Sequence, residues 1–160
     1  MEIQNNIFSY ATLLKQVKAR VALAQKKAIY AANEEMLTMY WDIGKLLSES
    51  QKQIGWGNNA LERLSKDLKN DYPKVKGFSP RNCRCMIQFY KEYNQELTIW
   101  QRAVAKLETP DIILPIKQLS WSHNIALVQK VKDHKARYWY MIQCIRNGWT
   151  RDFLVEAIKI

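Results

Sequence analysis

Apolar residues recur at steps of three and four between Ile7 and Gln53, a stretch that contains no proline and one glycine, Gly44. The recurring positions are Tyr10, Leu14, Val17, Val21, Ala24, Ala28 and Ala31, followed by Met36, Met39, Ile43, Leu46 and Leu47. This spacing is typical of an amphipathic helix, in which residues three and four apart share a face. Because the stretch exceeds the usual length of a globular helix, it predicts either two helices or one long bent helix.

The segment Met39–Gly44 is expected to be a packing point of this helical region. Gly44 has no side chain, so the backbone of another element can cross close to it. The alanine-rich stretch between Ala24 and Ala31 would likewise allow another helix to approach. We therefore expect another helix to pack against this region.

Residues 55–57 (Gly-Trp-Gly) interrupt the helical pattern and separate a second group of elements from the first. The next predicted helix covers 58–72, with Asn58 or Asn59 as its N-cap and an apolar side formed by Leu61, Leu64 and Leu68. A connector over 73–78 then leads to a helix over 79–97. Ser79 opens that helix as its N-cap, and Pro80 takes the first helical position. Two helices joined by a short connector with a glycine have the layout of a helix-turn-helix or winged-helix unit.

The remainder of the chain predicts a short apolar segment and three further helices. Pro110 and Pro115 frame residues 112–114, a pattern compatible with a short strand or an extended packing segment. The three helices are expected to start at Ser122, Asp133 and Thr150, with ends near Val131, Gly148 and Ile160. The predicted fold class is therefore all-α. A long amphipathic region over 1–54 is joined to a helix-turn-helix-like domain over 55–160, and the two are expected to form one compact unit.

The chain has 160 residues, of which 48% are hydrophobic, and a formal net charge of +10. Its three cysteines form no disulfide framework, and neither a signal-peptide core nor a membrane-spanning apolar run is present, so we expect a cytoplasmic protein without membrane contact. The excess charge lies in residues 55–95, with eight basic and four acidic side chains, and in residues 121–160, with seven and three. Clustered positive charge favours a polyanionic partner.

The predicted helix over 79–97 has two distinct sides. Its apolar side consists of Cys83, Met86, Ile87, Tyr90 and Leu97, and its opposite side presents Arg81, Arg84, Gln88 and Lys91. A recognition helix needs this division, because one side anchors it while the other offers long donors to phosphates and base edges. Ser79, Arg81 and Asn82 lie at the helix start, which usually enters the major groove and whose free N–H groups attract phosphate.

Lys74 and Lys76 in the connector would add phosphate contacts to this helix. The predicted nucleic-acid-binding residues are therefore Lys74, Lys76, Ser79, Arg81, Asn82, Arg84, Gln88 and Lys91. A solvated basic side on any surface helix produces the same pattern, so that interpretation remains open beside the first.

Other chemistry is poorly supported by the sequence. Cys83 and Cys85 are two residues apart on a helix and point away from each other, so they cannot share a metal ion. His123 is expected to have a structural role, and His134 to be exposed without a carboxylate partner. The aromatic run Tyr138–Tyr140 is expected to be mostly core or interface, since three consecutive helical residues cannot all stack on bases. We predict no catalytic residue, no metal site and no cofactor, and hence no enzymatic activity for this chain.

Several short motifs, taken in order, resemble the N-terminal domain of the YhcG-type nuclease family. They are Tyr40-Trp41-Asp42-Ile43-Gly44, Gly55-Trp56-Gly57, Leu64-Ser65-Lys66-Asp67-Leu68, Gly77-Phe78-Ser79-Pro80-Arg81-Asn82, Leu119-Ser120-Trp121-Ser122-His123, Lys132-Asp133, Arg137-Tyr138-Trp139-Tyr140 and Gly148-Trp149-Thr150. The resemblance runs from about Leu13 to the end of the chain. Cys83 stands where the family usually has an aliphatic residue, and residues 98–112 match no motif.

The resemblance implies a helical, winged-helix-like N-terminal domain of a larger bacterial protein. In that family a PD-(D/E)XK-type nuclease domain follows and carries the metal-binding carboxylates, so we expect this chain to be the part that precedes it. The predicted function is a module that binds or positions nucleic acid, in particular DNA, for that C-terminal nuclease domain. The alternative is a protein-interaction or dimerisation module without nucleic-acid contact, with a homodimer as the candidate assembly.

Overall fold

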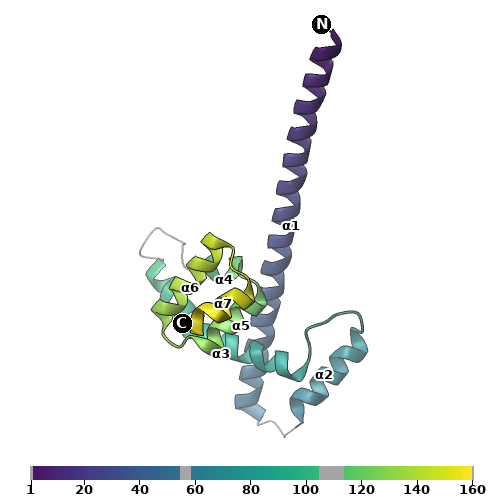
Figure 1. Cartoon of the computed structure of the whole chain (residues 1–160). Coiled ribbons are helices and arrows are strands. Elements are labelled where there is room, and N and C mark those ends of the chain that lie inside the picture. The colour runs from purple at the N-terminus through teal and green to yellow at the C-terminus, as the bar shows by residue number, and fades with distance from the viewer. Residues whose placement is uncertain (1, 55–58, 105–113, 160) are drawn as a thin grey trace.

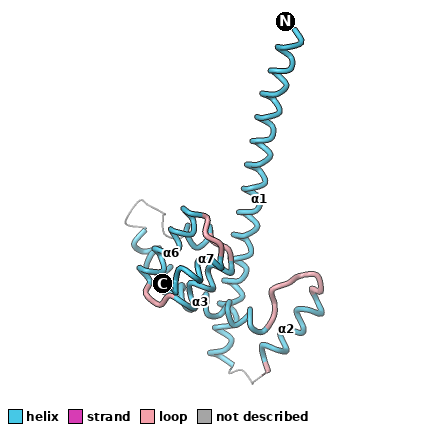
Figure 2. The backbone as a smooth tube through the Cα atoms, viewed as in Figure 1, coloured by secondary structure: helices cyan, strands magenta, loops and turns pink. Residues whose placement is uncertain are grey.

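The computed structural model describes residues 2–54, 59–104 and 114–159, and these residues form helices joined by short connections (Figures 1 and 2). The helices are α1 (Glu2–Ile54), α2 (Ala60–Asp71), α3 (Pro80–Val104), α4 (Leu114–Gln118), α5 (Trp121–Lys130), α6 (His134–Asn147) and α7 (Arg151–Lys159). The predicted all-α class is confirmed. No strand occurs in the described ranges, so the wing of a winged helix is not confirmed.

The whole N-terminal region is one helix of 53 residues, so the two-helix alternative is wrong. Figure 1 shows α1 running past the other helices and projecting far beyond them at its N-terminal end. Only its C-terminal part is buried, beginning near Asn33, whose side-chain amide donates to the carbonyl oxygens of Lys117 and Leu119 at 3.1 and 3.0 Å. None of the described helices has an apolar stretch long enough to cross a membrane.

α1 and α3 cross at Gly44, as the sequence predicted. A Cβ atom added at Gly44 would collide with the carbonyl oxygen of Met86 and would lie 2.7 Å from its carbonyl carbon. The same atom would stand 3.1 Å from the Cβ of Tyr90 on the next turn of α3. The backbones therefore meet directly, and no residue with a side chain fits at position 44 without moving one of the helices.

Aromatic rings extend this crossing to α5. Trp41 of α1 meets Phe89 of α3 edge to face, with 5.6 Å between the ring centroids, and Phe89 meets Trp121 of α5 at 5.2 Å. Tyr40, which is buried, lies 4.7 Å from the same tryptophan ring. Edge-to-face pairs at these distances add to the stability gained from burial alone. The three helices therefore share one aromatic core that fixes their relative positions.

Most helix starts agree with the predicted caps, with one correction. The hydroxyl of Ser79 accepts from the backbone N–H of Asn82, and Asp133 and Thr150 cap α6 and α7 in the same way. The predicted cap Ser122 is wrong, because Ser120 accepts from the N–H of His123 and caps α5. Trp121 is already helical, which places Ser122 inside the first turn.

The region between α3 and α5 was the least predictable part of the chain. α3 continues to Val104, beyond the predicted end near Leu97. Leu114 belongs to the short helix α4, so it is neither strand nor extended, whereas residues 112 and 113 lie outside the described residues. Pro115 is buried, which indicates that α4 packs into the fold rather than lying on its surface.

An ion pair with one fully buried partner joins α6 to α3. Arg137 is 1% exposed, and its guanidinium donates to Glu92 at 2.8 Å and to the backbone oxygen of Val131. His134 also lies 3.6 Å from Glu92, so the expectation that it has no carboxylate partner is wrong. A buried guanidinium requires such a partner, because desolvation of an unpaired charge is costly.

The burial of Arg137 also explains why the aromatic run after it is not core. The buried residues of α6 are Arg137, Met141 and Cys144, spaced by four and three on one face. Tyr138 and Trp139 lie off that face and are 41% and 54% exposed, while Tyr140 is half-buried. The core prediction for this run is therefore wrong for its first two residues.

The Gly44→Ala variant tests the backbone crossing. The added methyl group must displace the carbonyl of Met86, so we expect the free energy of unfolding to fall by about 1–3 kcal/mol, the usual cost of overpacking. Thermal unfolding followed by circular dichroism measures the change. Lys45→Ala, at the neighbouring exposed position, is the control and should melt close to the wild type. Equal melting temperatures for Gly44→Ala and the wild type would contradict the direct contact.

The Glu92→Gln variant tests the ion pair. It leaves the buried guanidinium of Arg137 without a counter-charge, and we expect the free energy of unfolding to fall by about 2–4 kcal/mol. This is less than for a fully buried ion pair, because Glu92 is partly exposed. Urea unfolding measures this loss. Glu156→Gln, which removes a carboxylate from an exposed pair with Lys159, is the control and should cost less than about 0.5 kcal/mol. Similar losses in both variants would argue against a structural role for the buried pair.

Candidate nucleic-acid interface

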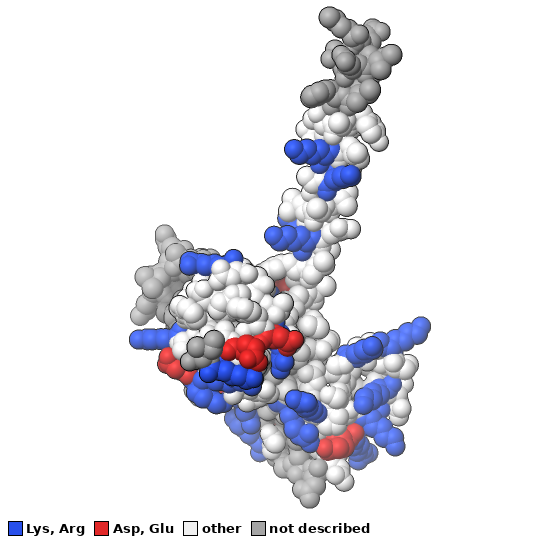
Figure 3. All heavy atoms as spheres, viewed as in Figure 1, with Lys and Arg blue, Asp and Glu red and all other residues white. Residues whose placement is uncertain are grey.

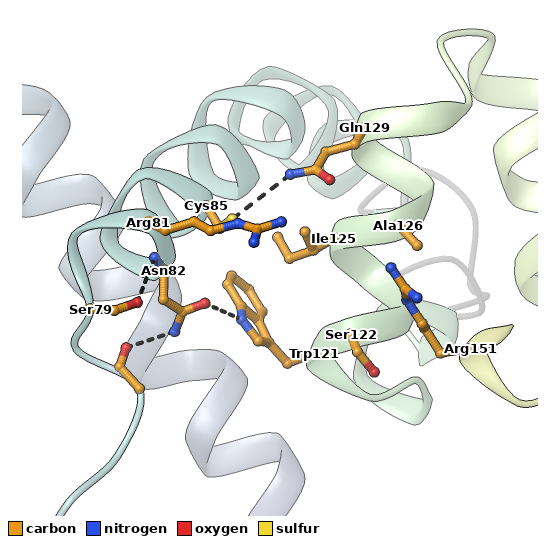
Figure 4. A pocket seen from close by; sticks show the side chains of 11 residues that line it. Ser79, Arg81, Asn82, Cys85, Trp121, Ser122, Ile125, Ala126, Gln129 and Arg151 are labelled. Carbon is orange, nitrogen blue, oxygen red and sulfur yellow. Dashed lines mark hydrogen bonds between the residues drawn. The ribbon is translucent and has the colours of Figure 1, made fainter. Parts of the chain in front are cut away.

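The start of α3 is fixed by hydrogen bonds that involve Asn82. Its side-chain amide donates to the carbonyl oxygen of Gly77 at 2.6 Å, and its side-chain oxygen accepts from the indole N–H of Trp121 at 2.8 Å (Figure 4). Gly77 has a φ of 106°, which favours glycine, and a Cβ there would collide with the hydroxyl of Tyr40. Burial raises the pKa of Tyr40, and its hydrogen bond to Asn82 partly offsets this rise. Asn82 therefore joins α1, α3 and α5.

A groove of about 350 Å³ lies between the first turn of α3 and α5. Trp121, Ile125 and Ala126 supply its apolar surface, and α7 adds Arg151 at one end. In Figure 4, the side chain of Arg81 extends from α3 over the groove toward α5, and Arg151 approaches from the opposite end. Ser79, Ser122 and Gln129 add polar groups to its lining. The lining contains two guanidinium groups and no carboxylate.

The structure brings only part of the predicted set into this groove. Ser79, Arg81 and Asn82 line it, but both ends of the Asn82 amide are engaged within the protein. Arg151 was missed by the sequence analysis, because nothing in a linear pattern connects the start of α7 with the start of α3. The only signal was its place in the basic C-terminal block, directly after the motif Gly148-Trp149-Thr150.

The other predicted residues of α3 lie outside the groove. Arg84 is exposed and donates to Glu62 of α2 at 2.8 Å. The backbone N–H of Glu62 itself and the Arg84 guanidinium both lower the pKa of this carboxyl. Lys91 is exposed, as its position opposite the apolar side of α3 requires, whereas Gln88 is half-buried.

Basic side chains also cover the neighbouring surface. Lys74 and Lys76 are exposed in the connector between α2 and α3, as are Lys66 and Lys69 on α2. In Figure 3, Lys and Arg gather over α2 and this connector, with few acidic side chains among them. The connector is held to α2 by a buried hydrogen bond from the hydroxyl of Ser65 to the carbonyl oxygen of Phe78. The predicted lysines thus lie on a fixed segment of the fold.

The three cysteines are buried, and both ring nitrogens of the half-buried His123 have partners within the protein. Cys83, Cys85 and Cys144 are buried free thiols, and burial raises the pKa of each. The ring nitrogens of His123 lie 2.6 Å from the Ser120 hydroxyl and 2.8 Å from the Trp149 carbonyl oxygen. Within the described ranges, no three His, Cys, Asp or Glu side chains gather in a way that could hold a metal ion.

Residues 16–160 match the DUF1016 N-terminal domain family. The chain belongs to this family. This is the N-terminal domain of the YhcG-like proteins, so the resemblance seen in the sequence motifs is confirmed. Neither the curated proteins nor the solved structures include a match. The groove and the basic surface around it are therefore described for a DUF1016 N-terminal domain from its own geometry.

Proposed function

We propose that this DUF1016 N-terminal domain binds nucleic acid, in particular DNA, and positions it for a nuclease domain of the same protein, with no catalytic step of its own. The observation that carries the proposal is that Arg81 and Arg151 both line the same groove. These residues come from the two segments that hold most of the excess positive charge. Guanidinium groups bind phosphate through two parallel hydrogen bonds, which favours this site for a phosphate backbone.

The surroundings of the groove support the same ligand. The hydroxyl groups of Ser79 and Ser122 add hydrogen-bond donors, and the N-terminus of the long helix α3 adds a favourable dipole. Arg151 also contacts the adjacent Asp152 at 3.2 Å, but Asp152 is 89% exposed. Such a pair is weak in water and can give way to a phosphate.

Additional phosphates would meet the basic residues outside the groove. Lys74, Lys76, Arg84 and Lys91 are exposed, and each contact with a phosphate would release counterions from the nucleic acid. Gln88 remains a candidate for contact with a base edge or sugar. Asn82 is assigned a positioning role instead, since its amide holds the start of α3 against Trp121 and Gly77.

The double variant Arg81→Ala/Arg151→Ala tests the groove. We expect DNA affinity to fall by about tenfold or more, and the slope of log affinity against log salt to decrease by about two, one for each lost phosphate contact. Fluorescence anisotropy with a labelled duplex and a labelled branched DNA measures both quantities. The melting temperature should stay close to that of the wild type, because both side chains are exposed.

Lys130→Ala/Arg146→Ala is the matched control for this experiment. It removes the same number of positive charges from exposed positions that do not line the groove. Its affinity for DNA should remain within about threefold of the wild type. An unchanged affinity in Arg81→Ala/Arg151→Ala would contradict the proposal. Equal losses of affinity in both double variants would show that the two arginines contribute only through the net charge of the protein and not through the groove.

The Glu62→Gln variant tests the contribution of Arg84. Glu62 holds the Arg84 guanidinium at 2.8 Å, so the amide should release this group for phosphate and remove a nearby negative charge. We expect DNA to bind about two to five times more tightly, as the exposed position of the pair allows. The gain should disappear in Glu62→Gln/Arg84→Ala. Weaker binding by Glu62→Gln alone would show that the pair holds Arg84 in its binding position.

A further inference from the structure

The projecting part of α1 carries apolar side chains that face solvent. Tyr10 is 65% exposed, Val17 and Val21 are each 50% exposed, and none of them belongs to the hydrophobic clusters of the fold. Figure 1 shows this part of α1 extending away from the other helices. Isolated exposed apolar residues need no explanation, but a continuous row of them on one helix indicates an interaction surface.

These residues follow a heptad pattern. The row consists of Tyr10, Leu14, Val17, Val21, Ala24, Ala28 and Ala31, which alternate in steps of four and three and which we call the α1 seam. No charged residue occupies a seam position over three full heptads, or about 33 Å of helix. An apolar repeat of 3.5 residues sustained over this length indicates a coiled coil.

The α1 seam faces away from the rest of the protein. The buried residues of the C-terminal part of α1 include Leu37, Tyr40, Gly44 and Leu47, and they define the side that packs on α3. At about 100° per residue, the mean direction of the α1 seam lies roughly 150° from that side. The described helices therefore cannot cover the α1 seam by continuing the packing that they already make with α1.

Between two copies of this chain, the flanking charges favour the parallel orientation. Residues 9–33 contain five basic and no acidic side chains. The residues that border the α1 seam on its two sides contact each other across a coiled coil. In a parallel, in-register pair, a residue on one side meets a residue on the other side, and these contacts join Leu13 to Lys18, Arg20 to Gln25 and Lys27 to Ala32. Each contact therefore contains a single charge. In an antiparallel pair, residues that border the same side of the α1 seam meet, which brings Arg20 and Lys27 together. Like charges at such contacts are destabilising.

We propose that the α1 seam pairs with the α1 seam of a second copy of this chain in a parallel, in-register, two-stranded coiled coil. Lys15 and Lys26 point outward in this arrangement, and their repulsion across the pair is screened by salt. Association of the two chains should therefore strengthen as salt rises from low to physiological concentration. Binding of an acidic protein or a nucleic acid to the same helix would instead weaken as salt rises.

Sedimentation equilibrium of the 160-residue chain without nucleic acid tests this proposal. We expect the wild type to reach the mass of a dimer at micromolar concentration, and the Val17→Ser/Val21→Ser variant to dimerise at least about tenfold more weakly. Serine and valine have similar helix propensities, so α1 itself should be retained. Leu23→Ser/Ile29→Ser is the control, because it removes two exposed apolar side chains of the same helix from outside the α1 seam. Its dimerisation should stay within about threefold of the wild type.

Cross-linking tests the orientation of the two chains. Leu14→Cys and Ala28→Cys, made separately, should each form a disulfide-linked dimer under mild oxidation, because both positions meet their own counterparts in a parallel pair. An antiparallel pair can bring at most one of them next to its counterpart. The native cysteines are buried and should give little background. The binding of DNA to the groove is independent of this experiment, so the two proposals stand or fall separately.

Several outcomes would overturn the coiled coil. They are a monomeric mass at the highest concentration, equal weakening by the α1 seam variant and its control, and cross-linking at only one of the two cysteine positions. A dimer that weakens as salt rises would likewise contradict the proposed contacts, because the flanking positions of the parallel pair contain no opposite charges to screen.

Discussion

The direct contact between the backbones of α1 and α3 at Gly44 is the constraint on which the rest of the fold depends. Because no side chain separates the two helices there, the residues on either side of the crossing come close enough to place Tyr40 and Trp41 against α3 and α5. Tyr40 in turn reaches Gly77 and Asn82 at the start of α3. The position of the groove therefore follows from a glycine that lies on another helix and outside the groove.

Local rules predicted most of the helices, because each depends on residues that are neighbours in the chain. The Ser79 cap, the Gly44 crossing and the division of α3 into a buried and an exposed side could all be read from spacing. The failures came from long-range contacts. The indole of Trp121 engages Asn82 and the carboxylate of Glu92 engages Arg137, and both partners are far away in the sequence. Neither spacing nor composition contains that information.

The same reasoning applies to the candidate site. Arg81 was identified because an exposed arginine in the first turn of a helix is a local feature, whereas Arg151 required the packing of α7 beside α5. The burial of Arg137 shows the reverse error, since a residue of the basic C-terminal block is internal and pairs with Glu92. The count of charges along the chain therefore included Arg137, which adds nothing to the basic surface. The same count did not indicate that Arg151 lines the groove.

The continuity of α1 has a geometric consequence for any assembly built on the α1 seam. A helix turns by about 100° at each residue, so the number of residues between Ala31 and Gly44 sets the angle between the α1 seam and the body of the protein. In a parallel pair, a half-turn about the axis of the coiled coil relates the two grooves, and this angle sets how far each groove lies from that axis. The length of one uninterrupted helix would then define the path available to a single duplex that contacts both copies.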